Sequence, residues 1–375
     1  FRSICKGLEG NGGRIKNRTG QKRLRKDSII FMTTELAANG KPFVHNHGAH
    51  CETAVTSALF RHHGVNVSEP MVFGIGSGIF FGYLPFLKLT HLPISAFRGK
   101  PGSVFRKAAN RLGADFVTKK FSDPKKGTEE LRRVLKTGQI VGLATNLYWL
   151  PYMSERHRWN FSGHNIIVVR EIENGFRVSD PTIGDMVDCT VEGLEQARFV
   201  PGPLNPRGYM YYNKTINHHP DLRQACIKGM KDTCNLMLRI PLPIFGVRGI
   251  RFLAKKVMQS PDKLGFQEAC RHLAGTVRWV EETGTGGAGF RYMYAAFIQE
   301  ASELFGSEDL VRLSRDMTAI GDTWREFSVM SARIIKKRNR PEATFANAGG
   351  LILKCADLEE AFFRDLQKVV KKLKA

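Results

Sequence analysis

The stretch "SGHNIIVVREIENGFRVSDP", residues 162–181, decides the fold expected for this chain. Two largely apolar runs, "HNIIVVREI" (164–172) and "GFRVSD" (175–180), lie on either side of Asn174-Gly175. Both residues of that pair tolerate positive φ, so an Asn-Gly between two such runs predicts a tight antiparallel hairpin.

Helices are expected before this hairpin and further strands around it. The helical patterns are "CETAVTSALFRHHG" (51–64), "SVFRKAANRLG" (103–113, N-cap Ser103) and "TEELRRVLKTG" (128–138, N-cap Thr128), each ended by a glycine. The other strand patterns are "QIVGLATNL" (139–147) and "DMVDCTV" (185–191). Helices followed by an antiparallel sheet predict an α+β domain.

A change from mixed helix and strand patterns to mainly helical patterns suggests the domain organisation. The Pro- and Gly-rich segment "PGPLNPRG" (201–208) resembles a boundary, and amphipathic helical patterns continue from there to the end, interrupted at 282–290. We therefore expect an α+β domain over residues 40–212 and a helical domain over 213–375. Residues 1–31 carry nine Lys and Arg against two acidic residues and are expected to be a disordered basic extension.

Composition bounds the class of protein. The chain has 375 residues, of which 42% are hydrophobic and 25% charged, as in globular proteins. It has no run of 18 apolar residues, so no transmembrane segment is expected. The seven cysteines show neither a CxxC pair nor a regular spacing, which favours a reducing, cytoplasmic setting over a disulfide framework.

The net charge of +22 requires an anionic partner or substrate. Nucleic acid, membrane lipid and an acidic protein all satisfy this requirement. The sequence contains no zinc finger, no RNP-like aromatic motif and no basic stripe confined to one helix, so we expect no nucleic-acid binding. Charge alone does not identify the partner.

The segment "HNHGAHCETAV" (45–55) carries three histidines, a cysteine and a glutamate, and a metal site is the first alternative. Zinc sites need three or four ligands in recognisable pairs with carboxylates behind them, and no HExxH motif is present. We therefore expect no metal.

The second alternative makes Cys51 a nucleophile. Cys51 stands where the loop turns into an apolar helix, and the unpaired N–H groups of a first helical turn stabilise a thiolate. Such a nucleophile needs a base that a third group orients. His164 at the start of one strand and Asp180 at the end of the next are candidates. Pairs about the hairpin turn should sum to roughly 349, which sets Asp180 near Val169. A strand-end histidine and an Asx turn before Pro181 are the alternative interpretation.

Several motifs together resemble a known family. "HCETA", "GIGSGIFFGY", "LPY", "GHNIIVV" and "VSDP" are similar to the N-terminal domain of the butirosin biosynthesis protein H family, a papain-like domain related to the peptidases of bacteriocin exporters. "TGTGGAGFRYMYAAFIQEA" resembles the second, helical domain that accompanies it in many bacterial homologues. The resemblance covers about residues 40–375. It implies Cys51 as nucleophile, His164 as general base and Asp180 as the residue that orients it.

The same resemblance implies a reaction. It predicts an acyltransferase of secondary-metabolite or lipid-like biosynthesis that moves an acyl group from an acyl carrier protein to a small-molecule amine. The donor is the phosphopantetheine thioester of the carrier, and no cofactor is bound. Carrier proteins are acidic, so the positive charge of this chain would attract and orient them. A cysteine peptidase or amidase with water as acceptor, and a non-catalytic basic binding protein, are the alternatives.

Further site residues follow from the resemblance or stay open. Papain-like enzymes use a side-chain amide before the cysteine as oxyanion donor, and the candidates here are Asn46 and His45. "GIGSGIFFGYLPF" (74–86) predicts either an acyl or pantetheine tunnel, with Gly76, Phe80 and Tyr83, or a buried packing loop. Glu52 is either an ammonium contact or a residue that favours the helix N-terminus.

Overall fold

The computed structural model describes residues 33–89, 91–155, 158, 160–202, 205–338 and 340–374. The expected basic extension at 1–31 lies outside the described residues. The described chain combines antiparallel sheets with a long helical C-terminal region, which confirms the α+β class.

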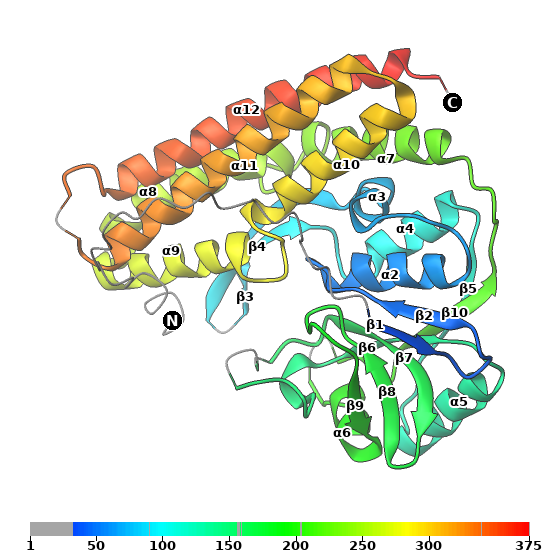
Figure 1. Ribbon diagram of the computed structural model, residues 1–375. Helices are drawn as coiled ribbons and strands as arrows, with labels where there is room; N and C mark the ends of the chain where they lie inside the picture. Colours follow the sequence, from blue (N-terminus) through cyan, green and yellow to red (C-terminus); the bar gives the residue numbers. More distant parts are fainter. Residues whose placement is uncertain are drawn as a thin grey trace, which may run out of the picture.

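A six-stranded sheet forms the centre of the N-terminal half (Figure 1). Its order is β5-β10-β6-β7-β8-β9, and all neighbours are antiparallel. The strands are β5 (Asp115–Lys119), β6 (Val141–Thr145), β7 (His164–Ile172), β8 (Gly175–Ser179), β9 (Val187–Thr190) and β10 (Met210–Thr215). Because β10 inserts between β5 and β6, segment 201–208 connects two parts of one sheet, and the boundary expected after residue 212 falls inside β10.

Helices cover both faces of the sheet (Figure 1). The helices are α2 (Cys51–His62) and α4 (Ser103–Arg111) on one face, and α5 (Pro124–Lys136) and α6 (Val191–Arg198) on the other. Alternate residues of β7 serve the two layers: Ile166 and Val168 belong to the cluster beneath α5 and α6, and Ile167 and Val169 to the cluster that includes α2. Burial on both faces explains why "NIIVV" is continuously apolar.

The β7–β8 hairpin forms where the sequence predicts it, but its turn differs. Ile172 pairs with Gly175, so the loop consists of the two residues Glu173 and Asn174. Gly175 is a strand residue, and a Cβ at this position would lie 2.2 Å from the carbonyl oxygen of Cys189 on β9. The glycine therefore permits close strand approach, which a turn signal in the sequence does not reveal.

Two expected N-caps are wrong. Ser103 is the first residue of α4, and the N-cap is Gly102 with φ 76°. Helix α5 begins at Pro124, four residues before Thr128, and the Asp123 carboxylate caps it by accepting from the backbone N–H of Lys125. Asp followed by Pro is an ordinary helix start, and it outweighs the later threonine.

The remaining N-terminal elements lie outside the central sheet. They are the hairpin of β1 (Thr33–Leu36) and β2 (Pro42–His45), helix α3 (Glu69–Ile75), and the hairpin of β3 (Ile79–Leu89) and β4 (Leu92–Arg98). A short 3-10 helix, η1 (Leu147–Trp149), follows β6. The β3–β4 hairpin contacts the C-terminal helices, so it joins the two halves of the molecule (Figure 1).

The C-terminal half is helical, as expected. Its elements are α7 (Leu222–Leu238), α8 (Gly246–Leu264), α9 (Phe266–Glu281), η2 (Ala288–Phe290), α10 (Arg291–Phe305), α11 (Glu308–Ile335) and α12 (Phe345–Lys372). One hydrophobic cluster contains side chains of both halves, from Phe43 on β2 to Val370 on α12. None of the described helices has the length and apolar character needed to cross a membrane.

Candidate active site

Cys51 is the first residue of α2, as the sequence predicts. The preceding residue, His50, has an extended backbone and its side chain does not cap the helix, so the N–H groups of the first turn are left available. The Cys51 side chain is nearly buried, with 9% of the residue exposed. Its Sγ lies 3.8 Å from the carbonyl oxygen of Gly163, the residue before β7.

A bulge in the β7–β8 hairpin brings His164 and Asp180 together. The register shifts between Val168 and Arg170, and Ile167 pairs with Ser179, so the paired numbers sum to less than the predicted value. Continued by one residue, this register sets Asp180 two positions from His164 and on the same face of the sheet. Nε2 of His164 lies 2.7 Å from Oδ2 of Asp180.

The Asp180 carboxylate is fully buried and has four hydrogen-bond partners. Its Oδ2 accepts from His164 and from the Tyr152 hydroxyl at 3.1 Å. Its Oδ1 accepts from the backbone N–H and the hydroxyl of Thr182, at 2.9 and 2.7 Å. The Asx turn and the contact with His164 therefore occur in one residue, although the sequence presented them as alternatives. Burial opposes ionisation, but the His164 charge and these hydrogen bonds lower the pKa of Asp180.

The thiol and the imidazole form a coupled pair. Burial opposes the thiolate, but the hydrogen bond and charge of His164 outweigh it, and the pKa of Cys51 falls below its usual value. Burial also opposes the imidazolium, whereas Asp180 and Cys51 stabilise it and raise the pKa of His164 to about 10. Because the Asp180 carboxylate only accepts, it holds the proton on Nε2 and leaves Nδ1 for the thiol.

The two expected oxyanion donors make other contacts. His45 is fully buried: its Nδ1 lies 2.8 Å from the Ser179 hydroxyl and its Nε2 lies 3.0 Å from the carbonyl oxygen of Ile183. The Asn46 amide oxygen accepts from both terminal nitrogens of Arg61 at 2.8 and 2.6 Å, and its nitrogen donates to a backbone carbonyl. Both side chains brace the loop before α2: these contacts occupy both ring nitrogens of His45 and hold the Asn46 amide against Arg61.

A different amide lies beside the thiol. Nδ2 of Asn165 is 4.0 Å from Sγ of Cys51 and donates to the carbonyl of Gly163 at 3.2 Å. Its Oδ1 accepts from the hydroxyl of Tyr211 at 3.0 Å. Our sequence reasoning missed Asn165, although it directly follows His164 and strand alternation turns it toward the α2 face.

Glu52 has a structural role. Its buried carboxylate pairs with Arg98 at 2.9 Å and accepts from the backbone N–H groups of Gly102 and Phe105, both at 3.0 Å. It therefore caps α4 from a neighbouring helix, where Gly102 has no side chain to do so. These contacts account for both oxygens of the carboxylate.

We expect Glu52→Gln to lower the free energy of unfolding by about 2 to 4 kcal/mol, because it removes a buried charge that Arg98 and two amides require. Urea unfolding measures the loss, and Glu129→Gln, at an exposed position on α5, is the matched control. An unchanged stability with a raised KM for an amine acceptor would restore the ammonium interpretation.

The other expected substrate contacts pack between layers. A Cβ on Gly76 would lie 2.7 Å from the carbonyl oxygen of Val104, so this glycine allows α3 to approach α4. Phe80 lies against Phe245 and Tyr83 against Phe252, with ring centroids 5.6 and 5.8 Å apart. These contacts match the packing alternative for segment 74–86.

The helical half contacts the loop before Cys51. The Phe290 ring meets the His50 ring edge-on at 5.1 Å and stacks on Phe73 at 5.0 Å. A Cβ on Gly286 would lie 3.2 Å from that of Ala49. The interruption at 282–290 is therefore more than a turn between helices, because it packs on the start of α2.

The histidine-rich segment does not gather ligands. His50 is buried with Nε2 unpartnered, and burial, together with the charges of Arg98 and His164, holds its pKa well below the usual range. His47 is exposed. Within the described residues, no three His, Cys, Asp or Glu side chains lie in an arrangement that could hold a metal ion.

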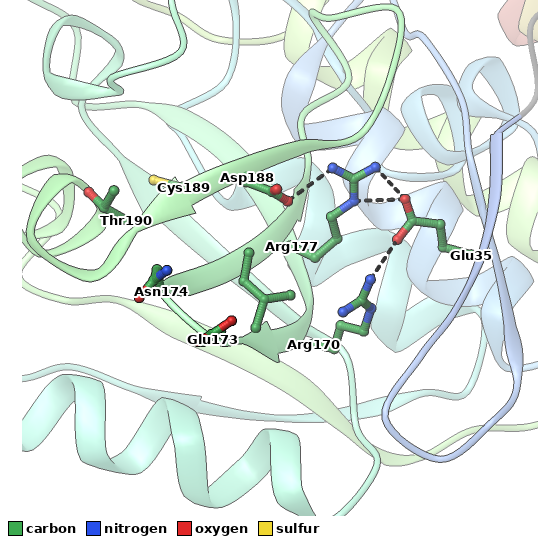
Figure 2. Close-up of a pocket in the computed structure, with 9 residues that line it drawn as sticks. Glu35, Arg170, Glu173, Asn174, Arg177, Asp188, Cys189 and Thr190 are labelled. Atoms are coloured by element: carbon green, nitrogen blue, oxygen red, sulfur yellow. Dashed lines mark hydrogen bonds and ion pairs between the residues drawn. The ribbon is translucent and has the colours of Figure 1, made fainter.

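A surface pocket of about 440 Å³ lies away from these residues, beside the β7–β8 hairpin and β1 (Figure 2). Figure 2 shows the Arg177 guanidinium between Asp188 and Glu35, with Arg170 on the second oxygen of Glu35. The two arginines are paired with acidic side chains, so the pocket is no anion site. Burial raises the pKa of its Cys189 thiol to about 12, which keeps that thiol protonated.

The α+β fold and the contiguous thiol, imidazole and carboxylate define a class of protein with a cysteine–histidine–aspartate site. Two family models match the chain: residues 50–181 match "Butirosin biosynthesis protein H, N-terminal", and residues 192–366 match "Domain of unknown function (DUF4872)". The match over residues 50–181 supports a butirosin biosynthesis protein H-like family, as the motifs indicate. No curated protein matches it significantly.

Proposed function

We propose that this protein is a biosynthetic enzyme, a papain-like cysteine acyltransferase that moves an acyl group from an acyl carrier protein to an amine. One observation carries the proposal: Cys51 at an uncapped helix start touches a His164 whose other nitrogen is held by Asp180. The family name, which refers to biosynthesis, supports a biosynthetic role.

In the first half-reaction the Cys51 thiolate attacks the carbonyl carbon of the carrier's phosphopantetheine thioester. A new S–C bond forms and the carbonyl oxygen becomes an oxyanion. When the tetrahedral species collapses, the bond to the carrier sulfur breaks and that sulfur takes the proton of the His164 imidazolium. The products are an acyl-Cys51 thioester, a carrier thiol and a neutral His164.

In the second half-reaction the nitrogen of an unprotonated amine attacks the acyl-Cys51 carbonyl. Neutral His164 accepts one proton from that nitrogen, and collapse releases the Cys51 thiolate and an amide. The thiolate–imidazolium pair is regenerated with no net proton change in the enzyme. An amide is more stable than a thioester, so the second half-reaction drives the sequence forward.

Two features favour an amine over water and a carrier over a peptide. Cys51 and His164 are only 9% and 3% exposed, and a site this buried limits the access of bulk water. The net charge of +22 attracts an acidic carrier protein and steers its approach. The cysteine peptidase or amidase alternative uses the same residues, so experiment must separate them.

The test is to incubate the protein with acyl carrier proteins loaded with short-chain, long-chain and aminoacyl groups. Intact mass spectrometry should show an increase equal to the acyl group, and peptide mapping should place it on Cys51. Added amines should then remove the adduct faster than buffer alone. Cleavage of peptides without any adduct from any carrier would favour the hydrolase and reject the proposal.

The coupled pair predicts a bell-shaped dependence of acylation rate on pH. The reactive thiolate–imidazolium form exists above the lowered pKa of Cys51 and below the raised pKa of His164, near 10. The rate should therefore rise at a pH below the usual thiol range and fall near pH 10. Asp180→Asn removes the charge that supports the imidazolium, so its falling limb should move to lower pH. A single rise at the ordinary thiol pKa would contradict the ion pair.

A further inference from the structure

The Asn165 side chain occupies a position beside the thiol that the two half-reactions leave without a role. It is 9% exposed, on the face of β7 that α2 covers, and its Nδ2 is 4.0 Å from Sγ of Cys51. Its backbone N–H also helps to lower the pKa of the thiol. The residue therefore presents its side-chain N–H donor to the reacting sulfur.

The contacts of Asn165 determine which way its amide faces. Nδ2 is 3.2 Å from the carbonyl oxygen of Gly163, so an exchanged amide would set two acceptors against each other. Oδ1 is 3.0 Å from the Tyr211 hydroxyl, which has to donate because the amide oxygen only accepts. One Nδ2 hydrogen serves Gly163, and the second remains for the side of the thiol.

Tyr211 is itself held firmly. It is 1% exposed, and its ring lies 4.6 Å from that of Phe105 on α4. Gly142 on β6 leaves the space for the ring, since a Cβ there would lie 2.4 Å from it. Burial raises the pKa of Tyr211 well above its usual range, so the hydroxyl remains a donor throughout the working pH range.

The chemistry requires donors at this place. When Sγ bonds to a carbonyl carbon, the developing oxyanion lies within about 3 Å of the sulfur, and donors aimed there stabilise the transition state. The first turn of α2 supplies backbone N–H groups that no His50 side chain caps. A neutral amide is a suitable second donor, because it has no charge to neutralise the thiolate beforehand and no proton to lose.

We infer that Asn165 is the side-chain oxyanion donor of this site, the role that sequence reasoning gave to Asn46 or His45, and that Tyr211 is its positioning residue. The inference rests on the proposed acyl transfer. Asn165 stabilises the oxyanion in both half-reactions, releases it on each collapse and forms no covalent bond itself. Tyr211 acts only through Asn165.

Comparing acylation with alkylation of the Cys51 thiol distinguishes an oxyanion-donor role of Asn165 from a structural role. Acylation by a loaded carrier passes through an oxyanion, whereas alkylation by iodoacetamide displaces iodide at a saturated carbon and forms none. Asn165→Ala should lower the single-turnover acylation rate by about 10²- to 10³-fold. The same variant should keep the alkylation rate, measured on its high-pH plateau, within a few fold of wild type.

Tyr211→Phe keeps the ring and removes only the hydrogen bond, and should lower acylation by roughly 10-fold. The double variant should be no slower than Asn165→Ala alone, because Tyr211 acts through Asn165. Tyr209→Phe is the matched control: its ring lies 5.6 Å from that of Tyr211, and it should acylate like wild type. Thermal unfolding checks that each variant folds.

The outcomes distinguish the two proposals. If wild type acylates Cys51 and Asn165→Ala does so equally fast, the oxyanion role is wrong and the acyl transfer stands. If acylation and alkylation fall together in Asn165→Ala and in Tyr211→Phe, the residue only maintains the thiol, and the inference is again wrong. If wild type alkylates but forms no adduct with any carrier, the acyl transfer fails and the oxyanion role fails with it.

Discussion

Replacing Cys51 by alanine is expected to abolish acyl transfer, with a fall in kcat of at least about 10⁴-fold. The reason is specific to covalent catalysis, because alanine has no nucleophile that could carry the acyl group between donor and acceptor. The carrier thioester should stay intact, and intact mass spectrometry should detect no adduct. Far-UV circular dichroism should be unchanged, because alanine fits the first turn of a helix.

Cys189→Ala provides the matched control. Cys189 is also buried, at 1% exposure, but burial raises its pKa to about 12 and it lies on β9, away from His164. This variant should form the acyl adduct at the rate of wild type. An adduct that persists in Cys51→Ala, or that disappears in Cys189→Ala, would show that Cys51 is not the nucleophile.

Local chemistry made three residues of the candidate site, Cys51, His164 and Asp180, predictable. A cysteine at the start of an apolar helix and a histidine and aspartate at the ends of adjacent strands each have a recognisable setting. The local sequence around each residue does not predict that their side chains meet, because the bulge between Val168 and Arg170 decides which residues of β7 and β8 face each other. A bulge depends on the local twist of two strands and left no clear signal in "IIVVREI".

Asn165, the oxyanion donor that we propose, was not predictable by position along the chain. Counting back from Cys51 led to His45 and Asn46, whose side chains bind Ser179 and Arg61 instead. Ser179 is distant in the sequence and Arg61 lies in the last turn of α2. The sequence therefore does not show that these two residues bind the side chains of His45 and Asn46. Asn165 comes near the thiol only because α2 lies across β7, a tertiary contact.

The division into two halves also looks different in three dimensions. Ala288, Gly289 and Phe290 all have positive φ, between 50° and 70°, which costs energy for the alanine and phenylalanine. This conformation turns Phe290 onto His50, the residue before Cys51. The helical half thus contributes to the site by supporting the loop that presents Cys51.

A buried ion pair holds that conformation. Arg291 and Glu359 are both fully buried and joined by two hydrogen bonds, at 2.9 and 2.8 Å. Arg291 also donates to the carbonyl of Gly289 at 2.7 Å, and Trp324 donates to Glu359 at 2.7 Å. The pair therefore connects α12 and α11 to the strained turn at the start of α10.

Glu359→Gln is accordingly expected to lower the free energy of unfolding by about 3 to 5 kcal/mol, because it leaves the Arg291 charge buried without a counter-charge. Urea unfolding followed by tryptophan fluorescence and circular dichroism measures the loss. Lys214→Met is the control: it breaks an exposed pair with Asp115 and should change stability by less than about 1 kcal/mol. The double variant Arg291→Met/Glu359→Leu removes both charges and should recover most of the loss.

The acylation rate then tests whether the pair also serves the site. If Arg291 and Glu359 hold Phe290 against His50, Glu359→Gln should acylate Cys51 more slowly even at temperatures where it is fully folded. The double variant should recover stability further than rate, because apolar side chains do not replace the hydrogen bond to Gly289. Wild-type acylation by a folded Glu359→Gln protein would show instead that the network stabilises the helical half and leaves the nucleophile loop unaffected.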